Sequence, residues 1–417
     1  MKLKYGLDDR PSFGAMLLYG LQWLMIAIPV VLTSTFVAPA GETVCFTQKM
    51  FAVLGITMIA QVLWGHRMPL IAGPAAVLLM GVISASAQGF GSEAIYPSIM
   101  LGGVLVALIA ASGLLAKMQR IFTPRVVVSI LFLIAFTIAK PIVGMLFADS
   151  DHQLFALVFA IVGVAVMAVA NNLLTGVWKS AVVIVAMIVG SLIYYCATGF
   201  PEQFATDSVE PRLINSPVRF DAGVVVAFVF CYIALFINEI GSVQSLGDMV
   251  GAGDMARRNR RGLAVTGIMN IVAGACGVLG PVDYSLSPGV IASTSCASRY
   301  TLLPAAVLMV LFALFPQGVA VLLTIPQPVM GMVLFYLMAT QIAAGLNMTA
   351  ATHAVGTFRD GMILGIPIML TIVMSFAPAQ AVAAIPALVR PIVGNGFVMG
   401  IITIMVLEHW LLRREAR

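Results

Sequence analysis

Two stretches carry the fold prediction: IAGPAAVLLM at 71–80 and VLGPVDYSLSPGV at 278–290. Each begins an apolar segment with a Gly-Pro pair, and the pairs Gly73-Pro74 and Gly280-Pro281 lie 207 positions apart (280 − 73). Proline removes a backbone hydrogen-bond donor and glycine favours non-helical backbone. Both segments are therefore predicted to be interrupted rather than continuous helices.

The chain around these stretches is strongly apolar. Of its 417 residues, 61% are hydrophobic and 9% are charged, whereas soluble proteins contain about a quarter charged residues. Since a spanning helix needs roughly 20 apolar residues, twelve runs qualify: 14–38, 49–65, 97–116, 124–147, 153–172, 178–199, 222–241, 263–279, 300–323, 326–346, 361–378 and 392–412. With the interrupted segments, at 69–87 and 281–297, we expect an all-α membrane protein of fourteen transmembrane segments.

The predicted segments fall into two repeats. Thr123-Pro124 and Gln327-Pro328 begin helices at nearly the same separation as the two Gly-Pro pairs, so the fourteen segments divide into two repeats of seven. Because seven is odd, the repeats have inverted orientations, as in many secondary transporters. The alternative is that the pairs match by chance in a chain with 38 Gly and 21 Pro.

Basic residues indicate the orientation. Arg10, the run 257–261 and Arg359 all fall on one side of the predicted topology, whereas Glu42 and Asp149 fall on the other. Lys and Arg accumulate in cytoplasmic loops, so we expect an integral protein of a bacterial-type inner membrane with both termini cytoplasmic. The net charge of +5 is dispersed between apolar runs and does not indicate nucleic-acid binding.

The interrupted segments mark a candidate substrate site. Irregular backbone at membrane depth is tolerated only beside protein or a water-filled cavity. If the two stretches meet at the midplane, their free amides suit a planar polar ligand, with substrate-binding candidates Ala75, Ala76, Asp283, Tyr284, Ser285 and Leu286. The alternative is that the stretches are kinks in packed helices.

Polar residues inside apolar runs are further candidates, because they are costly in a membrane. Asn238 and Ser242 are four residues apart and share a helical face. Glu239 faces either the cavity, as an ionisable carboxylate, or the interface, as a solvated acid beside Arg257. Asp283 is either a site residue or a local cap. Gln22 lies within the first predicted helix, where a buried amide needs a partner.

Catalytic and metal chemistry are not predicted. The histidines lie in loops or at helix ends, and none lies within four residues of another: His66, His152, His353 and His409. The five cysteines form no Cys-x-x-Cys pair, which argues against a disulfide framework or a metal cluster. We therefore expect no enzyme, no catalytic residue, no metal site and no cofactor.

Four stretches carry a resemblance to a known family. IPQPVMGMVLFY at 325–336 resembles an Ile-Pro-x-Pro-Val-x-Gly helix start, RRGLAVTGIMNIVAGACG at 260–277 resembles a Gly-rich ninth segment, and RPIVGNGFVMGIITIMVL at 390–407 resembles a last helix. LQWLMIAIPVVL at 21–32 is similar to a first helix that often carries Gln-His where this chain has Gln22-Trp23. The family is nucleobase:cation symporter 2, also called the nucleobase:ascorbate or xanthine/uracil permease family.

This resemblance implies a fold and a function. It implies a core domain of segments 1–4 and 8–11, at 1–121 and 221–323, and a gate domain at 122–200 and 324–417. Segments 3 and 10 would contribute short antiparallel strands to the site. Core would move against gate to alternate access for a nucleobase such as uracil, xanthine or urate, with coupling to protons or sodium, and a homodimer would form through the gate.

The chain departs from the family pattern at two carboxylates. Asn238 stands where segment 8 usually carries Glu, with Ser242 at the second polar position, and Leu286 stands where segment 10 often carries Glu. An amide donates and accepts hydrogen bonds but does not titrate. Coupling would therefore fall to Glu239 or Asp283, or be absent.

Two other readings stay open. A carrier of the same fold for a small anion such as sulfate, bicarbonate or a carboxylate would use the same interrupted segments. A non-transporting receptor or membrane enzyme would need a reactive pair or a soluble domain, and the sequence indicates neither.

Overall fold

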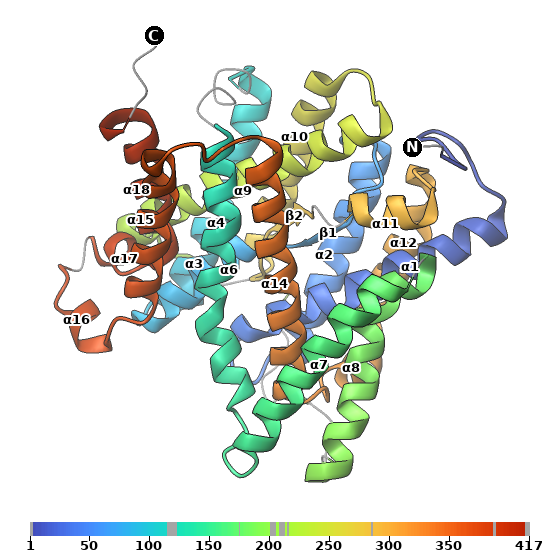
Figure 1. Cartoon of the computed structure of the whole chain (residues 1–417), viewed down its shortest axis with the longest axis horizontal. Coiled ribbons are helices and arrows are strands. Elements are labelled where there is room, and N and C mark those ends of the chain that lie inside the picture. Colours follow the sequence, from blue (N-terminus) through green and yellow to red (C-terminus); the bar gives the residue numbers. More distant parts are fainter. Residues whose placement is uncertain are drawn as a thin grey trace.

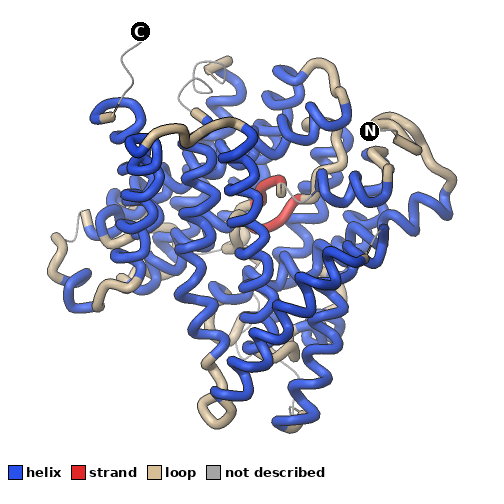
Figure 2. Tube along the Cα trace, viewed as in Figure 1, coloured by secondary structure: helices blue, strands red, loops and turns tan. Residues whose placement is uncertain are grey.

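The protein is almost entirely helical. The computed structural model describes residues 3–114, 123–174, 176–200, 206–207, 213–214, 217–284, 287–386 and 389–412 (Figures 1 and 2). The first half contains α1 (Phe13–Leu32), η1 (Thr33–Val37), α2 (Thr43–Leu63), β1 (Ala72–Pro74), α3 (Ala76–Ala87), α4 (Ser92–Ser112), α6 (Pro124–Leu146), α7 (Gln153–Leu173) and α8 (Gly176–Thr198).

The second half repeats this order of long helices around one short strand. It contains α9 (Ala222–Val250), α10 (Met255–Ala275), β2 (Pro281–Asp283), α11 (Ser287–Thr294), η2 (Arg299–Thr301), α12 (Leu302–Phe312), α13 (Pro316–Leu322), α14 (Gln327–Ala351), α15 (Phe358–Ser375), α16 (Ala379–Ala383), α17 (Arg390–Val393), α18 (Gly396–Val406) and η3 (Leu407–Leu411).

The two Gly-Pro stretches form a pair of antiparallel strands near the middle of the molecule (Figure 2). The register pairs Ala72 with Asp283, Gly73 with Val282, and Pro74 with Pro281. The backbone N–H of Ala75, which follows β1, donates to the carbonyl of Gly280 at 2.9 Å. The prediction that both stretches depart from helical geometry is therefore confirmed.

Many helices have the length and composition of membrane spans. Within the described residues, nine helices are long and apolar enough to cross a membrane, or ten if the bent pair 299–312 and 316–322 counts as one. That pair bends by 102°, so the prediction of a continuous helix over 300–323 is wrong. The bend falls where Pro316 begins α13, a position where proline is favoured because its missing N–H has no partner to lose.

Close packing between helices depends on glycine at a few positions. A Cβ added to Gly103 of α4 would lie 2.8 Å from the Gly267 carbonyl of α10, and a Cβ at Gly55 of α2 would lie 2.7 Å from the Ala306 carbonyl of α12. Small residues of this kind let membrane helices approach backbone to backbone. Each of these helix pairs joins the first half of the chain to the second.

The outer surface of α7 is apolar. Leu154, Ile161, Val166 and Leu173 are each more than half exposed. A contiguous apolar face of this kind is unfavourable in water and marks contact with a membrane or a partner. Since the chain has many candidate spans, we assign this face to lipid.

Both ends of the described chain lie on the same side of the molecule (Figure 1). The N-terminal segment is held there by hydrogen bonds from the Lys4 N–H to the Ser295 carbonyl, at 2.8 Å, and from the Ala297 N–H to the Tyr5 carbonyl, at 2.9 Å. Residues 295–297 follow α11, so the end of the second interrupted segment lies on the side of the termini.

Candidate substrate site beside the strand pair

A small cavity of about 80 Å³ lies beside the strand pair. One wall comes from α1, α3, α9 and β2, and the other comes from α6 and α14. The first wall includes Ala76, Asn238 and Tyr284, and the second includes Thr340 and Gln341. The cavity therefore lies where the elements around the strand pair meet a second group of helices.

Strand β2 and Tyr284, the residue that follows it, present alternate side chains to the cavity. Val282 and Tyr284 line it, and Asp283 between them does not. Successive side chains of a strand point to opposite faces, so Asp283 lies behind the strand. The Tyr284 ring is fixed, because its hydroxyl donates to the Pro74 carbonyl at 2.6 Å and its N–H donates to the Ile71 carbonyl at 2.9 Å.

Asn238 and Ser242 of α9 hold β2 from one side. The Asn238 amide donates to the Asp283 carbonyl at 3.3 Å, and the Ser242 hydroxyl donates to the same carbonyl at 3.0 Å. The prediction that they share a helical face is confirmed. Asn238 is half-buried and lines the cavity, whereas Ser242 is buried and does not line it.

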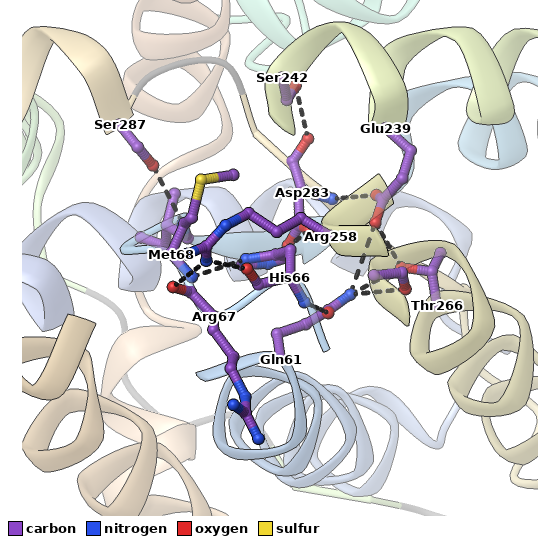
Figure 3. Close-up of polar contacts among 12 residues, drawn as sticks. Gln61, His66, Arg67, Met68, Glu239, Ser242, Arg258, Thr266, Asp283 and Ser287 are labelled. Carbon is purple, nitrogen blue, oxygen red and sulfur yellow. Dashed lines mark hydrogen bonds and ion pairs between the residues drawn. The ribbon is translucent and has the colours of Figure 1, made fainter. Parts of the chain in front are cut away.

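Glu239 is buried behind the strand pair (Figure 3). One carboxylate oxygen accepts from the Thr266 hydroxyl at 2.7 Å and from the Gln61 amide at 3.5 Å, and the other accepts from the Asp283 N–H at 2.9 Å. The alternative of a solvated acid at the interface is wrong, because only 1% of the residue is exposed. Glu239 also does not line the cavity.

Asp283 lies opposite His66, a residue that sequence analysis set aside (Figure 3). Its Oδ2 is 3.0 Å from His66 Nε2, and both residues are buried. The two atoms lie within ion-pair distance, but their geometry does not meet the criteria for a hydrogen bond. The alternative of Asp283 as a local cap gains no support, because its carboxylate meets a ring from a distant segment.

Other predicted site residues lie elsewhere. Gln22 is buried on α1, and it precedes the cavity residue Val30 by eight positions, or about 12 Å of helix. Ala75 is buried at the start of α3 and does not line the cavity, although Ala76 does. Ser285 and Leu286 lie outside the described residues.

Sequence reasoning missed several residues of this region. Thr340 and Gln341 supply polar groups from α14, and their only signal is a polar pair within an apolar run. Gln61 and Thr266 donate to Glu239 from α2 and α10. Nothing in local spacing connects these residues to α9, because they meet only through packing.

A larger cavity of about 610 Å³ lies further along the same group of helices. Its lining includes Gln88 at the end of α3, Lys140 of α6, Ser375 at the end of α15 and Arg390 of α17. The cavity also touches Gly396, where α18 begins, and the C-terminus follows the other end of α18. It therefore lies toward the side of the molecule opposite the termini.

Across the described ranges, no group of three or more His, Cys, Asp or Glu side chains has an arrangement that could hold a metal ion. The polar groups beside the cavity are amides, hydroxyls and the Tyr284 ring. Such groups orient a small polar molecule by hydrogen bonds.

Solved structures show the same fold. The transmembrane domain of a cyanobacterium bicarbonate transporter, BicA, matches with a TM-score of 0.65 and 15% identity, over 90% of this chain and all of that chain. The murine Slc26a9 anion transporter in the inward-facing state matches with a TM-score of 0.60 and 13% identity, over 95% of this chain and 69% of that one. At these identities the likeness concerns architecture alone.

Sequence comparison connects the chain with permeases. The uracil permease of Bacillus caldolyticus is 24% identical over 355 residues, which cover 82% of this chain and 81% of the relative. The xanthine permease XanP of Escherichia coli (strain K12) is 23% identical over 442 residues, covering 98% and 94%. A family model described as a permease family, that of the xanthine/uracil permeases, matches residues 14–380. The chain therefore belongs to the xanthine/uracil permease family, and it is a membrane transporter rather than an enzyme.

Proposed function

We propose that this protein is a secondary active transporter of a nucleobase such as uracil, xanthine or urate, driven by a coupling cation, proton or sodium. The observation that carries the proposal is the cavity beside the strand pair, with walls from two groups of helices. A site shared by two groups is opened by moving one group against the other. Membership of a permease family supports the same reading.

The chemistry of the cavity suits a planar heterocycle. Nucleobases carry ring N–H donors and carbonyl acceptors in one plane, and Asn238 and Gln341 each offer both a donor and an acceptor. Apolar side chains, including Val282 and Leu334, supply surfaces for the ring faces. The Tyr284 ring adds a fixed aromatic group, since both its hydroxyl and its backbone N–H are held.

The proposal includes fourteen segments in two inverted repeats. To the ten candidate spans of the described residues, with the bent pair 299–312 and 316–322 counted as one, it adds α10, α18, and the strand-led segments β1 with α3 and β2 with α11. The core comprises 1–121 and 221–323, the gate comprises 122–200 and 324–417, and both termini are cytoplasmic. A homodimer through the gate belongs to the same proposal. The larger cavity then provides access from the external side.

The test is counterflow in proteoliposomes made from the purified full chain. Vesicles preloaded with unlabelled uracil, xanthine, urate, bicarbonate or sulfate are given the same compound in labelled form outside. We expect transient accumulation of at least one base, reduced tenfold or more in Asn238→Ala, since a lost hydrogen bond in a buried site costs about 1 to 3 kcal/mol.

A matched control is available on the same helix. Gln244→Ala removes a partly exposed amide of α9, which donates to Asp248 at 2.8 Å and does not line the cavity, and should leave counterflow unchanged. Accumulation of bicarbonate or sulfate with none of any base would overturn the proposal in favour of an anion carrier. Binding of a base without counterflow would indicate a receptor.

A further inference from the structure

We propose that His66 and Asp283 form the proton-binding pair through which transport is coupled, with the proton carried on the Asp283 carboxylate. This inference rests on the proposed function, because it names the coupling ion and the residue that binds it. It begins from the 3.0 Å contact between His66 Nε2 and Asp283 Oδ2, behind β2 and away from the cavity (Figure 3).

The hydrogen bonds of His66 fix the position of its own proton. The N–H of Met68 donates to His66 Nδ1 at 3.0 Å, so that nitrogen carries a lone pair and no proton. In a neutral imidazole the other nitrogen is then the donor. Nε2–H therefore faces Asp283 Oδ2. A second ring proton would meet the Met68 N–H, so an added proton goes to the carboxylate.

The Asp283 carboxylate accepts fewer hydrogen bonds from the surrounding protein than the carboxylate of its neighbour Glu239. The oxygens of Glu239 already accept from Thr266, Gln61 and the Asp283 N–H. No described N–H or O–H group donates to Oδ1 of Asp283, and the carboxyl groups of Asp283 and Glu239 are close enough to share a hydrogen bond when one of them is protonated. Glu239 and Asp283 are both buried, and the backbone N–H of Asp283 donates to Glu239. If both carboxylates were ionised, this site would hold an excess of negative charge. A proton on Asp283 removes half of it.

The nearby cations do not neutralise this charge by contact. Arg258 of α10 donates to the carbonyls of His66 and Arg67, at 2.8 and 3.0 Å. Arg299, at the start of η2, donates to the Val62 carbonyl of α2 at 2.7 Å and pairs with Asp8. The Arg67 side chain is turned away from the pair and donates to the Leu63 carbonyl at 3.0 Å, so Glu239 of α9 is the charged group that shares a hydrogen bond with Asp283. The guanidinium groups instead hold the backbone that carries His66.

The pair lies between the cavity and the side of the termini. His66 is fully buried, and the next residue, Arg67, is exposed. Arg67 also adopts a φ of 56°, a backbone conformation that non-glycine residues rarely adopt. The tight turn at 65–68 is therefore held in an unfavourable conformation so that the ring reaches inward. The buried ring is therefore one residue away from the exposed surface on this side.

Strand β2 connects the pair to the substrate. Asp283 sits between Val282 and Tyr284, which line the cavity, and its carbonyl accepts from the cavity residue Asn238. One proton binds Asp283 when the site is open to the external side, and the same proton leaves on the cytoplasmic side together with the base. The two ligands are linked because they bind opposite faces of one three-residue strand.

The test compares proton flux with base exchange in proteoliposomes of the full chain. A pH-sensitive dye inside the vesicles reports proton entry when uracil, xanthine or urate is added outside, with and without sodium. Wild-type protein should acidify the lumen independently of sodium. Asp283→Asn should abolish proton flux and pH-driven accumulation and retain base counterflow within about threefold, whereas Glu239→Gln should retain a proton flux. Flux retained in Asp283→Asn and lost in Glu239→Gln would overturn the proposal.

A second measurement does not depend on base transport. The infrared carbonyl band of a protonated carboxyl group is titrated with pH in purified protein; it should be present in the wild type and absent from Asp283→Asn. His66→Leu removes a donor to the ionised carboxylate, so the midpoint should rise by about one pH unit. His66→Gln keeps a donor and should shift the midpoint less.

The outcomes separate the two proposals. If the wild type exchanges no base but the band behaves as described, the proposed function fails and the proton site stands. If the band persists in Asp283→Asn, or its midpoint is the same in His66→Leu and the wild type, the pair is not the proton site. If Asp283→Asn does not fold, the comparison of His66→Leu with His66→Gln decides.

Discussion

At the scale of single residues, the site depends on how closely β1, β2 and α1 approach one another. A Cβ added at Gly73 would overlap the Tyr284 ring and would lie 2.6 Å from Val30 Cγ1 of α1. The Tyr284 hydroxyl also donates to the Pro74 carbonyl. Glycine at 73 therefore allows the aromatic ring to lie flat against β1 and still reach its acceptor.

This packing gives a prediction for Gly73→Ala. The added methyl group must displace the Tyr284 ring or α1, because overpacking of this kind costs about 1 to 3 kcal/mol. We expect a lower thermal unfolding temperature and loss of base counterflow. Both are measured on purified protein. The unfolding temperature is taken from the fraction of protein that stays monodisperse in detergent after heating to a series of temperatures.

The control is a second glycine on a helix of the site. Gly241 of α9 has nothing within 4 Å of an added Cβ, so Gly241→Ala should stabilise the protein by about 0.5 to 1 kcal/mol through helix propensity. Equal destabilisation by the two substitutions would show that contact with Tyr284 and Val30 is not the cause.

At the scale of elements, a group of ionic contacts joins three helix ends away from the substrate site. Arg125, near the start of α6, lies 3.0 Å from Glu408 in η3 and 3.2 Å from Asp360 near the start of α15. Its Nε also donates to the Ala354 carbonyl at 2.9 Å. Both carboxylates are buried. One arginine therefore holds the ends of α6, α15 and α18 together.

Removing this arginine should destabilise the helix group. Arg125→Leu leaves two buried carboxylates without their cation, and breaking a buried ion pair costs about 3 to 5 kcal/mol. We expect a large fall in thermal stability, partly restored at low pH, because protonation removes the uncompensated charge. Arg260→Gln, at an exposed position of α10, should change neither. If Arg125→Leu were as stable as the wild type, the contacts of Arg125 would make no net contribution to stability.

At the scale of the whole molecule, the two cavities suggest the direction of access. The larger cavity lies toward the side opposite the termini, and the smaller one lies beside the strands. Ile134 and Ile138 of α6 line the smaller cavity and Thr137 lines the larger, so the same helix borders both. In the proposed topology the larger cavity is an external vestibule.

Chemical labelling checks this orientation. In a chain whose exposed Cys196 is replaced by serine, Lys140→Cys, at an exposed position in the lining of the larger cavity, should react with a membrane-impermeant maleimide added to intact cells. Arg260→Cys, near the run of arginines, should react only after permeabilisation. The reverse pattern would place the termini outside the cell. Reaction at Lys140→Cys that slows when the transported base is added would connect the vestibule with the transport path.

Much of the architecture follows from local sequence. The length of the apolar runs predicts helices, and the Gly-Pro pairs predict where two segments leave helical geometry, because these signals act within a few residues. The strands at 72–74 and 281–283 follow the predicted pattern, although pairing itself was implied only by resemblance to a family. The bend before Pro316 was missed, because the apolar run continues through it.

The sequence by itself determined a helical membrane protein, its interrupted segments and the shared face of Asn238 and Ser242, since helical and strand periodicity are local properties. Only the tertiary structure decided which polar groups meet. It turned Glu239 and Asp283 away from the cavity, and it brought His66 to Asp283 across 217 positions (283 − 66). Spacing along the chain cannot specify such contacts, because they depend on how the α2–β1 turn packs between α9 and α10.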